Sequence, residues 1–173
     1  TSLEIPQYIF PGPLQVFERF VEGFAIYVLA TMITLSEAAV GLSLALVATT
    51  CVGIVFALSR EAERYMSPVL VAMQSIPILS IAPLLTMWFG TGFSSKAVAA
   101  FVVCFFPLAA GWSSGIRAVR QDERDLFKTM GASRAQVAFR LVAPRALPFC
   151  FSGFRVATPL SILGAIVGEF VGA

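Results

Sequence analysis

Few residues in this chain have the types and spacing that enzyme chemistry requires. The 173 residues include no histidine, so the commonest general base and metal ligand at neutral pH is missing. Cys51, Cys104 and Cys150 lie far apart in apolar surroundings, without the short spacing of a metal or redox pair. The segment GTGFSSK, residues 90–96, lacks the glycine followed by lysine of a phosphate-binding loop. We therefore expect no catalytic residue, no metal site and no cofactor in this chain.

The polar residues inside apolar segments suit transport better than catalysis. Gln74, Ser75 and Ser80 lie in an uncharged stretch that also holds Pro77 and Pro83. Prolines free backbone carbonyls, and a membrane tolerates such broken geometry only against protein or a water-filled path. These three polar residues are therefore candidates for a translocation pathway, with ordinary hydrogen bonding between helices as the alternative.

Charged residues at membrane depth are few, and each is a candidate functional residue because its burial is costly. Glu169 follows small residues at four-residue steps, and we expect it either to line the pathway or to cap a helix end. Arg155 is expected to extend to the membrane surface, and Glu37 to be solvated at a boundary. Small residues at this spacing let another helix approach closely. They form two stripes, Gly41, Ala45, Thr49, Gly53 and Ala57, then Gly153, Ala157, Ser161 and Ala165.

The composition indicates an all-α membrane protein. Hydrophobic residues make up 58% of the chain, and the mean hydropathy is +0.86. The net charge of +2 gives no reason to expect a nucleic-acid partner. A helix needs about 20 apolar residues to cross a bilayer. The apolar segments predict four spans: 38–59, a kinked 66–95 with a reentrant or interfacial tail, 97–116, and about 147–173.

Basic residues orient these spans, because they accumulate on the cytoplasmic side. Two basic residues, Arg60 and Arg64, lie in the polar loop at 60–64, which is on the same side of the membrane as the loop 117–148. That side is therefore cytoplasmic. The loop 117–148 contains seven basic residues: Arg117, Arg120, Arg124, Lys128, Arg134, Arg140 and Arg145. Residues 1–37 then form an external segment with an interfacial helix over 14–37. Residues 38–173 form the transmembrane domain. Because four spans leave both ends external, we expect further flanking helices in the complete protein.

The loop 117–148 has the local signals of two short helices. Residues 122–130 are amphipathic, with acidic residues in the early turns where they complement the helix dipole. Gly131 suits the left-handed conformation that ends a helix, and Ser133 with Gln136 forms a capping box that begins another. The second helix is expected to end before Pro144. Such an element could transmit the movement of a soluble partner to the membrane spans. Alternatively, it could lie on the lipid headgroups.

The segment DLFKTMGASRAQVAFRLVAP, residues 125–144, resembles the EAA loop of ATP-binding cassette (ABC) importer permeases. Asp125, Gly131 and Pro144 have the spacing of that motif, whereas Leu126 and Phe127 replace two alanines. WFGTGFSSK (88–96) and GAIVGEFVGA (164–173) strengthen the likeness. Together they are similar to the permeases of the nitrate, sulfonate, taurine and pyrimidine-precursor importer group.

This resemblance implies a type I ABC importer transmembrane domain, with four of six spans in this chain, in the inner membrane. Its partners would be ATPase subunits that bind ATP and Mg, a second permease copy, an external substrate-binding protein and the lipid bilayer. The solute would be small and polar or anionic: a sulfonate, taurine, nitrate or a pyrimidine-like compound. The ATPase contacts would be Asp125, Leu126, Lys128, Gly131, Ala132, Ser133, Arg134 and Gln136.

Two other functions compete with an importer permease. A secondary transporter or channel subunit would need coupling-ion sites or internal repeats, and the sequence contains few membrane carboxylates and no evident repeat. A structural anchor for a cytoplasmic complex would make the proline-kinked spans incidental.

Overall fold

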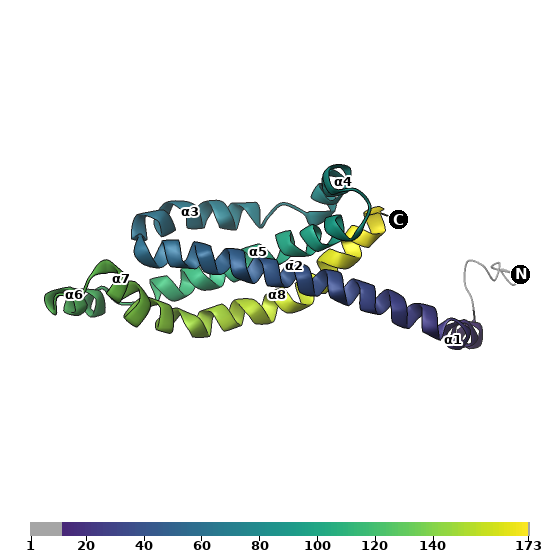
Figure 1. The fold of residues 1–173 in the computed structure, drawn as a ribbon, viewed down its shortest axis with the longest axis horizontal. Helices are drawn as coiled ribbons and strands as arrows, with labels where there is room; N and C mark the ends of the chain where they lie inside the picture. The colour runs from purple at the N-terminus through teal and green to yellow at the C-terminus, as the bar shows by residue number, and fades with distance from the viewer. Residues whose placement is uncertain (1–11, 173) are drawn as a thin grey trace, which may run out of the picture. The chain divides into compact units, whose positions relative to one another are not determined.

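The computed structural model describes residues 12–172, which form helices and no strand (Figure 1). These described residues divide into two compact units, with the boundary between Thr34 and Leu35. In the first unit, helix α1 (Pro13–Glu22) begins with a proline, whose missing N–H costs nothing in a first turn. Its Phe20 ring stacks on Tyr27, with the ring centroids 5.6 Å apart.

Helix α2 (Phe24–Leu58) differs from the predicted division between an interfacial helix over 14–37 and a span that begins at 38. The amphipathic helix ends at Glu22, and α2 begins directly after Gly23. No proline or glycine interrupts residues 24–40, so the helix continues through the expected boundary. The assignment of residues 1–37 to the external side remains a prediction.

Within residues 12–172, three helical segments are long and apolar enough to cross a membrane: α2, α5 (Phe93–Arg117) and residues 134–172. Helices α3 (Arg60–Met73) and α4 (Ile78–Phe89) are bent by 93° at a short break and add a fourth span if counted together. The predicted kink is thus present. The polar loop expected at 60–64 is wrong, because these residues form the first turn of α3. The Ser59 hydroxyl caps that turn by accepting from the Ala62 N–H at 3.3 Å.

Helix α5 packs closely against both α2 and α8 (Ala143–Gly172), along the two predicted small-residue stripes. A Cβ atom built on Gly41 of α2 would lie 2.6 Å from the carbonyl oxygen of Ala97. On α8, a Cβ atom at Gly153 would lie 2.7 Å from the carbonyl oxygen of Pro107. Only glycine allows the helices to approach this closely, so the stripes are confirmed as packing surfaces.

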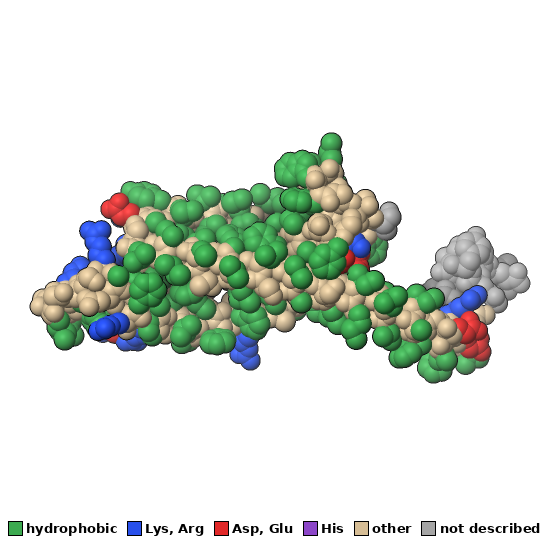
Figure 2. Space-filling model, in the orientation of Figure 1, with side chains coloured by type: hydrophobic (Ala, Val, Ile, Leu, Met, Phe, Trp, Pro, Cys, Tyr) green, Lys and Arg blue, Asp and Glu red, His purple; other side chains and the backbone are tan. Residues whose placement is uncertain are grey.

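The two ends of the second unit differ in chemistry. Helix α6 (Gln121–Thr129) and α7 (Arg134–Val137) lie at one end, and the turn between α4 and α5 lies toward the other (Figure 1). Lys and Arg side chains gather at the α6–α7 end, whereas hydrophobic side chains cover the visible flank (Figure 2). We call the α6–α7 end the basic end. A flank this apolar fits contact with lipid or with other membrane helices.

Candidate functional site at the basic end

A tight turn after α6 carries the predicted motif. The Gly131 N–H donates to the carbonyl of Lys128 at 2.9 Å, and the Ala132 N–H donates to that of Phe127 at 3.0 Å. This pair of bonds defines a Schellman motif, which needs a left-handed residue after the helix. Gly131 supplies that residue with φ 77°, as the sequence predicts.

The capping box that begins α7 is also confirmed. The Ser133 N–H donates to Oε1 of Gln136 at 2.7 Å, and the Gln136 N–H donates to the Ser133 hydroxyl at 3.3 Å. These reciprocal bonds satisfy two donors that would otherwise lack a partner at the helix start. The turn is therefore shaped from both sides by local hydrogen bonds.

The predicted end of the second helix before Pro144 is wrong. A π-helical turn, η1 (Ala138–Val142), follows α7 and leads directly into α8. There the Ala143 N–H donates to the carbonyl of Ala138, one residue further back than in an α-helix. The wider turn accommodates the ring of Pro144, which has no N–H to donate to the carbonyl four residues earlier. The helix therefore continues from Arg134 to Gly172.

Most of the predicted ATPase contacts lie on the surface. Ala132 is half-buried, and the other seven predicted residues are exposed: Asp125, Leu126, Lys128, Gly131, Ser133, Arg134 and Gln136. Leu126 is 59% exposed and Met130 is 77% exposed. Phe127 instead packs against a core cluster that includes Phe56 and Ile116. The apolar face of α6 is thus divided between the protein core and an exposed edge.

Asp125 belongs to a network of side-chain hydrogen bonds along α6. Its carboxylate accepts from the Lys128 ammonium at 2.9 Å and from the Gln121 amide at 2.9 and 3.0 Å. Its pKa lies below the ordinary value, because the Lys128 and Gln121 hydrogen bonds stabilise the ionised form. The Gln121 side-chain oxygen accepts from Arg60 of α3, which extends this hydrogen-bond network to a neighbouring helix.

Arg124 is the buried basic residue of α6. It is 6% exposed and donates from one terminal nitrogen to the carbonyl of Ile116, near the end of α5, at 3.1 Å. Its Nε–H has no hydrogen-bond partner among the described residues. Burial lowers the pKa of the Arg124 guanidinium, and the nearby charge of Arg60 acts in the same direction. Sequence reasoning counted Arg124 only as a topology signal and missed this contact.

A buried polar cluster lies beside α6, between α3 and α5. The carboxylate of Glu63 accepts from the Ser113 hydroxyl at 2.5 Å and from Arg117 Nε at 2.7 Å. Arg117 also donates to the Ser67 hydroxyl at 2.8 Å, and that hydroxyl in turn lies 3.0 Å from the Ser113 hydroxyl, to which it can donate. Sequence reasoning placed Glu63 in a loop and so missed the cluster. The available signal was the matched four-residue spacing of the two pairs, one on each helix.

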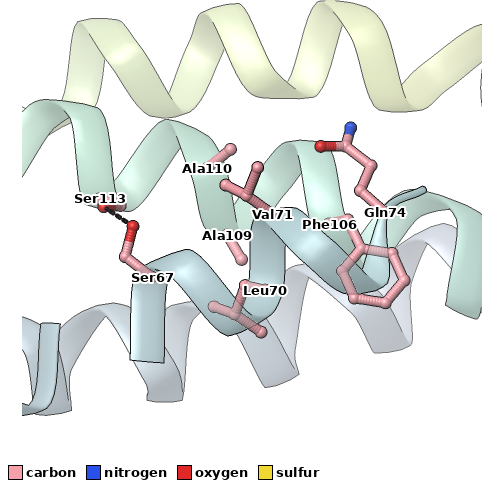
Figure 3. Close-up of a pocket in the computed structure, with 8 residues that line it drawn as sticks. All are labelled: Ser67, Leu70, Val71, Gln74, Phe106, Ala109, Ala110 and Ser113. Atoms are coloured by element: carbon pink, nitrogen blue, oxygen red, sulfur yellow. Dashed lines mark hydrogen bonds between the residues drawn. The ribbon is translucent and has the colours of Figure 1, made fainter. Parts of the chain in front are cut away.

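A small recess continues from this cluster along α3 and α5 (Figure 3). Gln74 lines it together with Ser67 and Ser113, and Phe106 contributes an aromatic wall. The other two candidate pathway residues, Ser75 and Ser80, are exposed and do not line the recess. The structure therefore groups Gln74 with hydroxyls that the sequence did not connect to it.

Charged residues also meet at the opposite end of the bundle. Glu37 is 1% exposed and forms an ion pair with Lys96 at 3.6 Å, so the expected solvated position is wrong. Glu169 is half-buried and interacts electrostatically with Glu37. A Cβ atom on the adjacent Gly168 would lie 2.9 Å from Cα of Lys96, which places α8 directly against α5 here. Glu169 therefore belongs to a charged group formed by three spans.

Several apolar spans, a helix pair bent by 93° and an exposed helical turn at a basic end are typical of a multi-pass membrane protein. The binding-protein-dependent transport system inner membrane component family matches residues 49–173. The chain belongs to this family. It is a permease subunit of an ABC importer and a multi-pass inner-membrane protein.

Individual relatives agree with this assignment. The formylaminopyrimidine transport permease protein of Halalkalibacterium halodurans is 33% identical over 167 residues, 96% of this chain and 67% of the relative. The riboflavin transport system permease protein of Chloroflexus aurantiacus is 37% identical over 168 residues, 96% and 63% of the two chains. The taurine transport system permease protein of Escherichia coli is 29% identical over 170 residues, 94% and 62%. The chain thus spans about two thirds of these relatives. Their shared class favours a non-enzymatic importer subunit over a secondary transporter or channel.

Proposed function

We propose that the exposed turn formed by α6, Gly131 and α7 is the EAA loop of this permease and docks an ATPase subunit. The observation that carries this proposal is the paired Schellman motif and capping box, which present an exposed Gly131 without help from a partner. A turn shaped in advance costs little conformational entropy on binding. ATP and Mg would be bound by the ATPase, and the basic end would face the cytoplasm.

Contacts with the ATPase would come from the exposed surface around this turn. Leu126 and Met130 provide apolar area, and Lys128 and Arg134 provide charge next to it. Interfaces commonly combine an apolar centre with a polar rim. Asp125 would act mainly by holding Lys128 in place, because its carboxylate already accepts hydrogen bonds from two side chains, those of Gln121 and Lys128.

The remaining partners follow from the family rather than from this chain alone. We propose a homodimer of permeases and an external substrate-binding protein that delivers the solute. The pathway would include Gln74, which lines one end of the recess, with the Ser67 and Ser113 hydroxyls at its other end (Figure 3). Ser75, Ser80 and Glu169 stay as candidates for the pathway outside that recess.

The proposed solute is small and polar, and planar nitrogen heterocycles are favoured over simple anions. Relatives named for formylaminopyrimidine and riboflavin transport are 33% and 37% identical, whereas one named for nitrate import is 25% identical. Mass spectrometry of the compound retained by the purified binding protein would test this preference. Recovery of nitrate or a sulfonate would contradict it.

Gly131→Arg tests the docking assignment. A Cβ atom on Gly131 would meet nothing within 4 Å, so the arginine would project outward and obstruct only a docked partner. Backbone strain at positive φ would cost about 1–2 kcal/mol. We expect the variant to accumulate in the membrane but to lose co-purification of the ATPase.

Gly131→Asn provides the matched control, since asparagine tolerates the left-handed conformation and has a short side chain. It should retain the ATPase. If Gly131→Arg bound the ATPase and supported its activity as well as the unsubstituted protein, the docking assignment would be wrong.

A further inference from the structure

Three arginine contacts connect α6 to three different helices of the bundle. Arg60 of α3 donates to the side chain of Gln121, and Arg145 of α8 forms an ion pair with Glu123. Arg124 of α6 itself donates to the carbonyl of Ile116 on α5. We call Arg60, Arg124 and Arg145 the arginine tethers.

The tethers matter because α6 is short and only part of its surface packs into the core. It has nine residues, and isolated helices of this length are marginal in water. Its apolar packing into the core includes Phe127, while Leu126 points outward. Without the arginine contacts, a partner that displaced α6 could therefore move it without moving the transmembrane helices.

We propose that the arginine tethers are positioning residues that transmit movement of α6 to α3, α5 and α8. This inference rests on the proposed docking function of the α6–α7 turn. Charge-assisted hydrogen bonds are short and directional, so they resist displacement in ways that apolar contact does not. Because the three contacts connect α6 to α3, α5 and α8, a displacement of α6 would be transmitted to all three helices.

Arg124 has the strongest individual case among the tethers. A buried donor without a partner is costly, yet its Nε–H lacks a hydrogen bond among the described residues. Glu63 interacts electrostatically with Arg124 and is already bonded to Arg117 of α5. Arg124 thus lies next to the buried cluster that joins α3 to α5, and that cluster leads to the recess lined by Gln74.

The test measures how accessible position 74 in the recess is to a thiol reagent, and compares the nucleotide-free complex with the complex trapped by Mg-ATP and vanadate. The full-length permease, in complex with its ATPase, would carry Gln74→Cys and be exposed to a maleimide with and without Mg-ATP and vanadate. Labelling of the peptide that contains position 74 would be measured by mass spectrometry, so the native cysteines do not interfere. Co-purification of the ATPase and its ATP hydrolysis would be recorded in the same preparations.

In Arg124→Met we expect the complex to assemble and hydrolyse ATP, but labelling at position 74 to lose its response to vanadate. Arg124→Lys should recover part of the response, because an ammonium can still reach the Ile116 carbonyl. Arg120→Met is the control: Arg120 is exposed and pairs with Asp122 at 2.6 Å, within the same segment. It removes one positive charge and should keep the full response. A full response in Arg124→Met would overturn its tether role.

A second variant covers the case in which Arg124→Met fails to assemble. Arg60→Met combined with Arg145→Met removes the two exposed tethers, whose side chains are not needed to fill the core. Loss of the vanadate response with retained ATP hydrolysis would support the inference, and an unchanged response would overturn it. If Gly131→Arg still binds the ATPase, the proposed function itself is wrong; if the Gln74→Cys complex without further substitutions shows no response to vanadate, the tether inference is overturned.

Discussion

Removing either partner of the buried Glu63–Arg117 pair should have very different effects on stability. The Glu63 side chain is 9% exposed and the Arg117 side chain is 58% exposed. In Arg117→Met the Glu63 carboxylate stays buried and keeps the Ser113 hydroxyl as a donor. In Glu63→Gln the freed arginine can turn toward water, and the amide can still accept from Ser113.

The expected magnitudes follow from this asymmetry. Breaking a buried ion pair from one side costs about 3–5 kcal/mol, and an exposed pair contributes at most about 1 kcal/mol. Because Arg117 is partly exposed, we expect Arg117→Met to cost about 2–3 kcal/mol and Glu63→Gln to cost about 1 kcal/mol. A protein of this size loses about 2–4 °C in Tm for each kcal/mol. Arg117→Met should therefore lower Tm by roughly 4–12 °C.

The double variant provides the sharper comparison. Replacing both partners removes the buried charge, so its stability should be close to that of Glu63→Gln and above that of Arg117→Met. Thermal unfolding of the detergent-purified protein, followed by circular dichroism, measures all three variants. If both single variants lost equal stability, or if the double variant were the least stable, the reasoning from burial would be refuted.

Two further predictions concern packing and titration. Gly153→Ala would force its Cβ against the carbonyl of Pro107 and should destabilise by about 1–3 kcal/mol in thermal unfolding. Gly92→Ala meets no atom within 4 Å and should lower Tm less, because it weakens only the N-cap of α5. The Asp125 carboxyl, followed by carbon-detected NMR, should titrate below its ordinary pKa, and Lys128→Met should raise that pKa. The Asp125 contacts should thus be intact above the ordinary pKa and be lost as pH falls through the lowered value. An unshifted carboxyl, or equal Tm losses in the two glycine variants, would contradict these predictions.

Local features of the chain were readable from the sequence because neighbouring residues determine them. The left-handed Gly131 and the capping box of Ser133 and Gln136 depend on contacts over three or four positions. The small-residue stripes were predictable for a similar reason, since helical periodicity alone places Gly41 and Gly153 on packing faces. These signals located the motif and the helix contacts.

Contacts between distant segments could not be derived in the same way. Glu63 and Arg117 are 54 positions apart, and only the matched four-residue spacing of the two polar pairs hints at their contact. Arg124 resembles its exposed basic neighbours until the fold buries it. The helix end expected at Pro144 failed because tertiary context and a π turn overrode a local rule.

The helix from Arg134 to Gly172 forms a strut without a loop, although a π turn and three prolines interrupt its α-helical hydrogen bonds. At 1.5 Å per residue, its 39 residues extend about 58 Å, enough to cross the hydrocarbon layer and reach beyond it. One end of the strut adjoins the proposed ATPase dock, and the other carries Glu169 beside Glu37. A rotation imposed near Gln136 would therefore reach the charged group without crossing a loop. A second place for bending is the elbow between α3 and α4, next to Gln74.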